Sequence, residues 1–201
     1  MVTSDIIARY NLQVDDASEL SSDEELALAQ EIYDEVCNDR PWEWLKTPAA
    51  GNTSTSVPYI ALPADFQELS PNRDNKSVIF VGADYQEYLV VPFSSRRDFR
   101  SMDGYCYIDI PNSRLYFTLQ PTSVKAVEYD YIKRPALLTL STAPLITTEQ
   151  FGKLIAYGMA SKFNAIEISE KDTSYRKENE ERYNKLLSDL RLEDCNIKLS
   201  I

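Results

Sequence analysis

The sequence predicts an α+β fold in which a small helical bundle, made of an N-terminal helix plus two C-terminal helices, carries an inserted antiparallel β-rich lobe. Helical periodicity marks both ends of the chain, whereas the middle holds short segments rich in Val, Ile and Tyr that turn residues separate. The 201 residues suit one domain with a sizeable insertion, and 43% hydrophobic residues are enough for a core.

The N-terminal region is expected to hold two helices. A short helix over residues 3–10 is followed by a longer one that starts at a capping box. Ser22 with Glu25 and Ser21 with Glu24 both fit this capping box. The longer helix presents an apolar stripe at helical spacing: Leu26, Ala29, Tyr33, Val36 and Cys37.

The middle region is expected to be β-rich. Residues 47–56 are rich in Thr, Ser, Gly and Asn, so we interpret them as a flexible loop. A tight hairpin turn is predicted at residues 109–114. Strands are predicted over residues 57–61, 66–70, 78–81, 86–91, 105–110, 114–118 and 124–132.

The C-terminal region is expected to hold the other two helices. The first starts at a capping box over residues 147–150, and its apolar face includes Gly158, which the close approach of another helix would explain. The last helix is predicted from about residue 171 to residue 192, and residues 195–201 alternate like a strand. The expected domains are a bundle of 1–50 with 145–201, an insertion of 51–144, and a C-terminal arm of 195–201.

The residues on which most soluble catalytic sites depend are missing, so we expect no enzyme and no catalytic, cofactor or metal site. The absence of histidine excludes histidine-based triads and histidine-containing zinc sites. The five glycines are too far apart for a phosphate-binding loop, and the three cysteines fit neither a disulfide framework nor a zinc knuckle. The remaining enzymatic alternative is a carboxylate pair in the middle region, from Asp84, Glu87, Asp103 and Asp109.

The net charge of −11 restricts the partners. An acidic surface repels phosphate, because DNA affinity comes mainly from Lys and Arg contacts, so sequence-specific DNA binding is not expected. The charge suits a surface that DNA passes without binding, although solubility explains most acidic surfaces. No apolar run has the length of a membrane helix and the N-terminus lacks signal-peptide features, so we expect a protein without membrane association that is made in the cytoplasm.

Three groups of residues are candidates for an interface. Trp42 and Trp44 would point the same way in an extended segment and suit an interface anchor, or alternatively a packing role under the end of the preceding helix. The basic cluster of Arg96, Arg97 and Arg100 suits a solvated loop or an ion-paired contact with an acidic neighbour. A strand donated to a neighbour, or a frayed terminus, would explain the last group: Ile197, Leu199 and Ile201.

Four short motifs follow the order of these elements: a Trp-containing exit from a helix at residues 40–44, a Leu-Pro start to the insertion at 62–66, a helix of aromatic and small residues at 151–163, and a charged last helix at 178–190. In this order they resemble the head-to-tail adaptor (connector) proteins of short-tailed bacteriophages, the tail tubular protein A or head-completion adaptor family. The resemblance covers most of the chain.

The resemblance implies a structural virion protein of the phage neck, assembled in the host cytoplasm. Family members form a homo-oligomeric ring, typically a dodecamer, below the portal protein; they extend the DNA channel used in genome ejection and present a platform for the next tail component. It also implies that DNA passes through without sequence-specific binding, and that residues 195–201 dock onto the portal. The alternatives are another neck or tail ring protein, such as a stopper or tube ring, and a non-catalytic cellular binding module.

Overall fold

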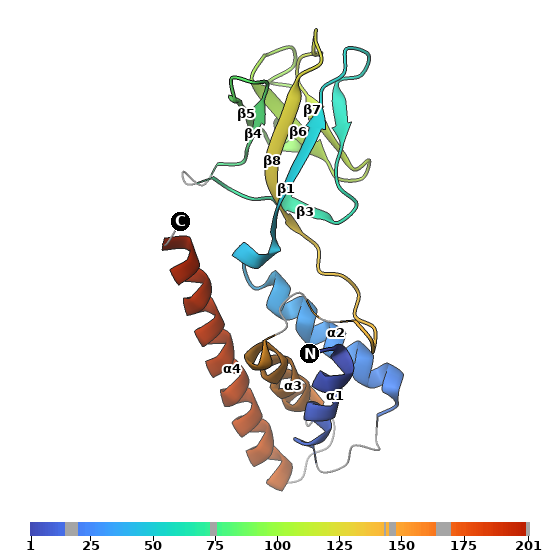
Figure 1. Cartoon of the computed structure of the whole chain (residues 1–201), viewed down its shortest axis with the longest axis vertical. Helices are drawn as coiled ribbons and strands as arrows, with labels where there is room; N and C mark the ends of the chain where they lie inside the picture. The colour runs from blue at the N-terminus through green and yellow to red at the C-terminus, as the bar shows by residue number, and fades with distance from the viewer. Residues whose placement is uncertain (15–19, 73–75, 143, 145–147, 164–169, 200–201) are drawn as a thin grey trace. The chain divides into compact units, whose positions relative to one another are not determined.

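The computed structural model describes residues 1–14, 20–72, 76–142, 144, 148–163 and 170–199. It confirms the α+β class, with helices and a large, mostly antiparallel sheet (Figure 1). Internal contacts divide the chain into a helical unit, Met1–Trp44 with Pro135–Ile201, and a β unit, Leu45–Arg134. The β unit begins and ends earlier in the chain than the insertion expected at 51–144.

The helical unit is arranged around its third helix. Helix α3 (Glu149–Phe163) packs against α1 (Thr3–Asn11), α2 (Ser22–Asn38) and α4 (Glu170–Leu199). The expected bundle of one N-terminal and two C-terminal helices is therefore not the arrangement observed, because the short α1 also contacts α3. The apolar surface of α3 explains its position: eight of its residues are buried.

Local side chains set the start of α2 and α3. The Glu24 amide donates to Ser21 Oγ (3.4 Å) and the Ser21 amide donates to Glu24 Oε2 (2.8 Å), so the capping box at Ser21 is confirmed. The alternative box at Ser22 is wrong, because Ser22 is the first residue of the helix and Ser21 is the N-cap. Thr148 caps α3, since its Oγ1 accepts from the Phe151 amide (3.3 Å); its predicted neighbour in the box, Thr147, lies outside the described residues.

Gly158 lets α3 approach two other helices closely, as the sequence predicted. A Cβ atom at this position would lie 2.6 Å from Ile32 Cγ2 of α2 and 3.1 Å from the Tyr183 ring of α4. Both distances are shorter than ordinary van der Waals contact, so only glycine fits here without moving a neighbouring helix.

The β unit is one eight-stranded sheet, antiparallel except for the parallel pair β5–β6. Its strands are β1 (Lys46–Asn52), β2 (Tyr59–Ala61), β3 (Phe66–Leu69), β4 (Val78–Val81), β5 (Gln86–Val90), β6 (Tyr105–Asp109), β7 (Arg114–Phe117) and β8 (Ala126–Lys133). Their order is β1-β8-β4-β5-β6-β7-β2, and β3 also pairs with β8. The predicted hairpin between β6 and β7 is confirmed, with Asp109 paired to Arg114.

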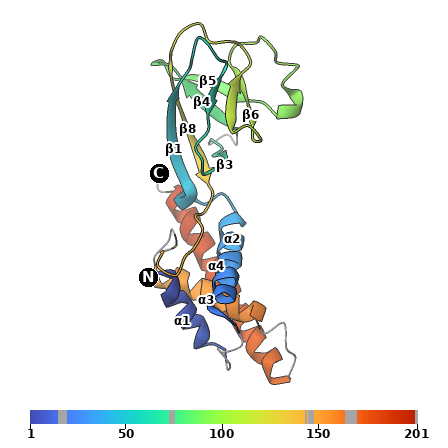
Figure 2. The ribbon, with the colours of Figure 1, turned by 90° about the vertical axis from the view of Figure 1, so that its right-hand side faces the viewer.

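Strand β1 corrects the flexible loop predicted at 47–56. It pairs with β8 along its whole length, from Lys46 opposite Ile132 to Asn52 opposite Ala126, and both views show the two strands side by side (Figure 1, Figure 2). The low strand propensity of its residues is overcome by pairing with β8, whose Val127, Tyr129 and Tyr131 are buried. Pro48 is tolerated because β1 is the edge of the sheet.

The core of the β unit is a continuous apolar cluster contributed by nearly every strand. Ile79, Cys106, Leu115 and Val127 have no exposed surface. Burial raises the pKa of the Cys106 thiol to about 12, so this cysteine stays protonated at neutral pH and acts as a small apolar side chain.

The predicted strand at 195–201 is wrong for the part that is described. Helix α4 continues to Leu199, because its last turns are fastened to the end of α2 by contacts of Asp194 and Cys195. Ile201 lies outside the described residues, as do the side chains of Ile197 and Leu199.

We expect Gly158→Ala to lower the free energy of unfolding by up to about 2 kcal/mol. Alanine gains ~1 kcal/mol of helix propensity, but the crowding against Ile32 and Tyr183 costs about 1–3 kcal/mol. Denaturant unfolding followed by circular dichroism measures the change. Gly51→Ala is the control, because a Cβ there meets Ile60 Cδ1 at an ordinary 3.6 Å. A stabilised Gly158→Ala variant would contradict the close approach.

Candidate functional site

The two tryptophans lie in a tight turn rather than in the extended segment that the sequence predicted. A 3₁₀ turn, η1 (Glu43–Leu45), follows Trp42, and the two indoles stack at 5.8 Å between ring centroids. Trp42 is fully buried and its Nε1 donates to the Val36 carbonyl (2.7 Å) at the end of α2. Trp44 packs edge-on against Phe151 of α3. This geometry favours the packing role over the interface role for Trp42.

Charged residues then fasten this turn to α4. Asp194, which is 2% exposed, accepts the Glu43 amide (2.8 Å) on Oδ1 and faces Arg40 Nη2 at 3.6 Å with Oδ2. One turn earlier, Arg191 binds the Asp39 carboxylate with two nitrogens, one of them Nε at 2.9 Å. We call these five residues the clasp. Because each pair joins α4 to the segment that follows α2, the clasp holds this part of α4 against that segment.

The predicted basic cluster lies between β5 and β6, around the short turn η2 (Phe93–Ser95). Arg96 folds back on Phe93: its guanidinium lies 3.8 Å from the ring centroid and Nη1 donates to the Phe93 carbonyl (2.7 Å). Arg97 and Arg100 are exposed. Within the described part of the chain, none of the three forms an ion pair, so the cluster has no acidic partner there.

The structure adds a row of rings that sequence reasoning did not find. Phe93 contacts Tyr107 of β6 at 5.8 Å, Tyr107 stacks on Tyr116 of β7 at 5.2 Å with parallel rings, and Tyr116 contacts Tyr59 of β2 at 5.2 Å. Arg96 lies over the ring at one end, and Arg114 lies over the Tyr59 ring (4.0 Å) at the other. We call these six residues the aromatic strip. Its only sequence signal is a tyrosine in each of three separate strands.

The strip is partly accessible and positively charged. Phe93 is 45% exposed, and the three tyrosines and both arginines are partly exposed. Arg114 also donates to the Tyr116 hydroxyl (3.2 Å), which raises the pKa of the guanidinium further, so this end stays charged. Aromatic rings combined with arginine are the side chains that protein interfaces favour.

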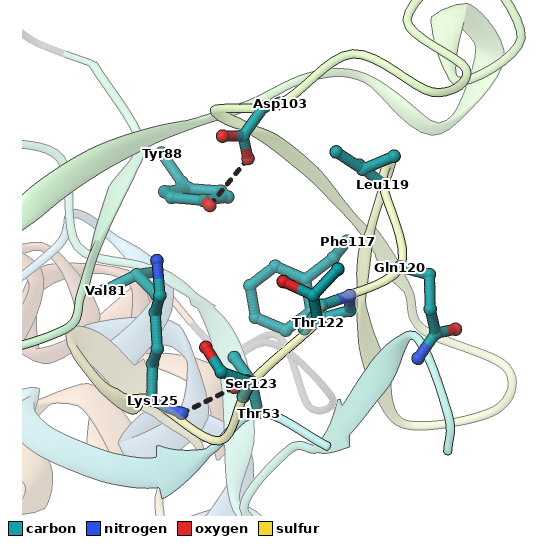
Figure 3. A pocket seen from close by; sticks show the side chains of 11 residues that line it. Thr53, Val81, Tyr88, Asp103, Phe117, Leu119, Gln120, Thr122, Ser123 and Lys125 are labelled. Atoms are coloured by element: carbon teal, nitrogen blue, oxygen red, sulfur yellow. Dashed lines mark hydrogen bonds between the residues drawn. The ribbon is translucent and has the colours of Figure 1, made fainter. Parts of the chain in front are cut away.

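A small pocket of about 90 Å³ lies elsewhere in the β unit (Figure 3). Asp103 accepts the Tyr88 hydroxyl (2.7 Å) on one wall, and on another Thr53 Oγ1 donates to the Ser123 carbonyl (2.9 Å) and accepts the Lys125 amide (2.8 Å). Burial and the Asp103 hydrogen bond raise the pKa of Tyr88 to about 12. The pocket is well below the size of ordinary ligand sites, so its polar groups serve the fold.

Two carboxylates of the alternative catalytic pair, Asp103 and Asp109, take part in local hydrogen bonds. Asp103 is held by Tyr88 and by the Gly104 amide, and Asp109 accepts the Asn112 side-chain amide (2.8 Å).

In the described ranges, no group of three or more His, Cys, Asp or Glu is placed to hold a metal ion, and no helix there is long and apolar enough to cross a membrane. The three cysteines are free, Cys37 and Cys106 being buried and Cys195 partly exposed.

A broad apolar groove of about 590 Å³ lies on the outside of β1, β8 and β4. Phe80 and Tyr85 meet edge to face at 6.4 Å on one side of it, and Ala49, Ala50 and Tyr129 also contribute. Tyr85 is 60% exposed, so the groove offers an accessible aromatic surface.

An aromatic strip, an apolar groove and a pocket too small for an ordinary ligand are typical of a protein that works by binding other macromolecules. A family model described as SU10 adaptor protein matches residues 1–195. The match spans nearly the whole chain, and the chain therefore belongs to the SU10 adaptor family of phage head–tail adaptor proteins. This confirms the predicted family, whose members are structural components of the phage. No curated protein matches the chain.

We expect Asp194→Ala to lower the free energy of unfolding by about 2–4 kcal/mol, because the Glu43 amide and Arg40 both lose their partner. Asp194→Asn keeps an acceptor for the Glu43 amide and should cost less. Asp189→Ala, an exposed aspartate on the same helix, is the matched control and should change stability by less than ~0.5 kcal/mol. Equal effects of the 194 and 189 variants would show that the clasp does not position α4.

Tyr88 makes the β unit sensitive to alkaline pH. Its folded pKa of about 12 exceeds the ~10 of an unfolded chain, so its contribution to stability is complete below pH ~10 and is lost as the pH rises toward 12. Tyr88→Phe removes this titration, so the melting temperature should fall less steeply between pH ~9 and ~11.5. The exposed Tyr85→Phe serves as control, and an unchanged slope for Tyr88→Phe would refute the assignment.

Proposed function

We propose that this chain is a structural virion protein that forms a ring at the phage neck, where it joins the portal protein to the next tail component and extends the DNA channel. The observation that carries the proposal is the match of residues 1–195 to the SU10 adaptor family. The ring is proposed to be a dodecamer, as in the related adaptors that the sequence resembles. On this proposal the chain is not an enzyme, and it needs neither cofactor nor metal.

The electrostatics support passage of DNA without binding. The net charge of −11 lies in the helical unit, which therefore offers phosphate little to bind, because non-specific DNA affinity depends on Lys and Arg contacts that release counterions. DNA would therefore pass through the channel without sequence-specific contacts during genome ejection. Residues 195–201 remain our candidate for the arm that docks onto the portal.

The apolar groove favours a second candidate, a non-catalytic binding module that holds a peptide against β1, β8 and β4. Such a module would work as a monomer, whereas a neck protein must assemble. A stopper or tube ring would need similar flat interfaces and is a further alternative at the neck. Whether the chain assembles on the portal protein distinguishes the adaptor from these other functions.

The test is to mix the full-length protein with portal rings of the same phage and to image the mixture by electron microscopy. We expect a collar of added density with the symmetry of the portal, which also counts the copies. A variant that ends at Asn196 should bind less while keeping its melting temperature, if the last residues form the docking arm. Bare portal rings beside free wild-type protein would refute the adaptor function.

A further inference from the structure

The acidic charge of the chain is confined to one region. Residues 1–44 contain 12 Asp and Glu against 2 Lys and Arg, a net charge of −10. The β unit, residues 45–134, contains 10 of each kind and is neutral, and residues 135–201 carry only −1. The overall charge of −11 therefore describes the N-terminal helices, and the β unit has no excess of acid to neutralise its arginines.

The β unit gathers four of its arginines at the aromatic strip. Arg96 and Arg114 lie over its terminal rings, and Arg97 and Arg100 are exposed beside Arg96 in the chain. Across the residues with described positions, none of these four arginines is ion-paired to a carboxylate. A guanidinium has five N–H donors, and the structure shows one hydrogen bond for Arg96 and one for Arg114, which suits the gripping of carboxylates from another surface.

Helix α2 offers carboxylates of the matching kind. Asp23, Glu31 and Glu35 are exposed and follow one another at spacings of eight and four residues, within about a third of the helix circumference. Lys162 binds both Glu31 and Glu35, which leaves the row net negative. The side chains are supported by a buried opposite face, so the row is held on a rigid element.

We infer that the aromatic strip of one copy binds the acidic row of α2 in a second copy. The inference rests on the proposed ring and names the contact that would build it. Two identical strips facing each other across a two-fold axis would bring like charges together, so this surface cannot form a symmetric dimer contact with itself. A strip against an α2 row joins two unlike surfaces, and such contacts, repeated head to tail from copy to copy, close into a ring when the rotation allows it.

The test uses two charge-reversed forms of the full chain. The first carries Arg96→Glu and Arg114→Glu, and the second carries Asp23→Lys and Glu31→Lys. In a sample of either form alone, the strip and the α2 row carry charge of the same sign. When copies of the two forms alternate, each contact joins a strip and a row of opposite sign. Sedimentation velocity at ~0.05 M salt should show self-association of the wild type, weakened at least about tenfold in either form alone and restored in the equimolar mixture.

Lys76→Glu with Lys125→Glu is the matched control, because both lysines are exposed in the β unit, lie off the strip and change the charge equally. It should associate like the wild type, and circular dichroism should show each variant folded. The inference is overturned if the mixture does not associate, or if wild type and reversed forms sediment alike, including as monomers. If the wild-type protein still adds a collar to portal rings in that case, the adaptor function is retained and the ring contact lies on another surface.

Discussion

The helical unit depends on the burial of Trp42 at the junction of α2, α3 and α4. The indole closes the end of α2 through its hydrogen bond to Val36 and stacks on Trp44, which reaches Phe151 of α3. The clasp joins the same turn to α4. Helix α4 needs this fastening, because two of its three buried side chains between residues 175 and 196, Asn179 and Asp194, are polar, so apolar burial alone does not hold it.

The two units differ in the surfaces that they offer. The helical unit carries all of the net negative charge, and the β unit carries the aromatic strip with its arginines. A chain with opposite binding properties in its two units favours contacts between unlike surfaces of neighbouring copies, which is the requirement for a ring. The match to the SU10 adaptor family shows the family, and the ring contact proposed above rests in addition on this distribution of charge.

Local signals predicted most of the elements, and failed where distant segments decided the outcome. The cap at Ser21, the hairpin at Asp109 and the small residue at Gly158 depend on neighbours in sequence or on one packed face, so their patterns were sufficient. Strand β1 has no strand pattern of its own, and only β8, about eighty residues later, makes it extended. The end of α4 was predicted as a strand because its partners at Asp39 and Arg40 lie about 150 residues away.

The sequence by itself determined the α+β class and the absence of histidine chemistry, because composition and periodicity are properties of single segments. Its resemblance to phage adaptors also predicted the family, which the family match confirms. The sequence also located the arginine cluster, since Arg96, Arg97 and Arg100 are adjacent in the chain. Only the tertiary structure decided that Trp42 is internal and that Tyr59, Tyr107 and Tyr116 form one row with Phe93. The physical reason is register: which rings stack is set by the pairing of β2, β7 and β6, and no local pattern specifies pairing between strands.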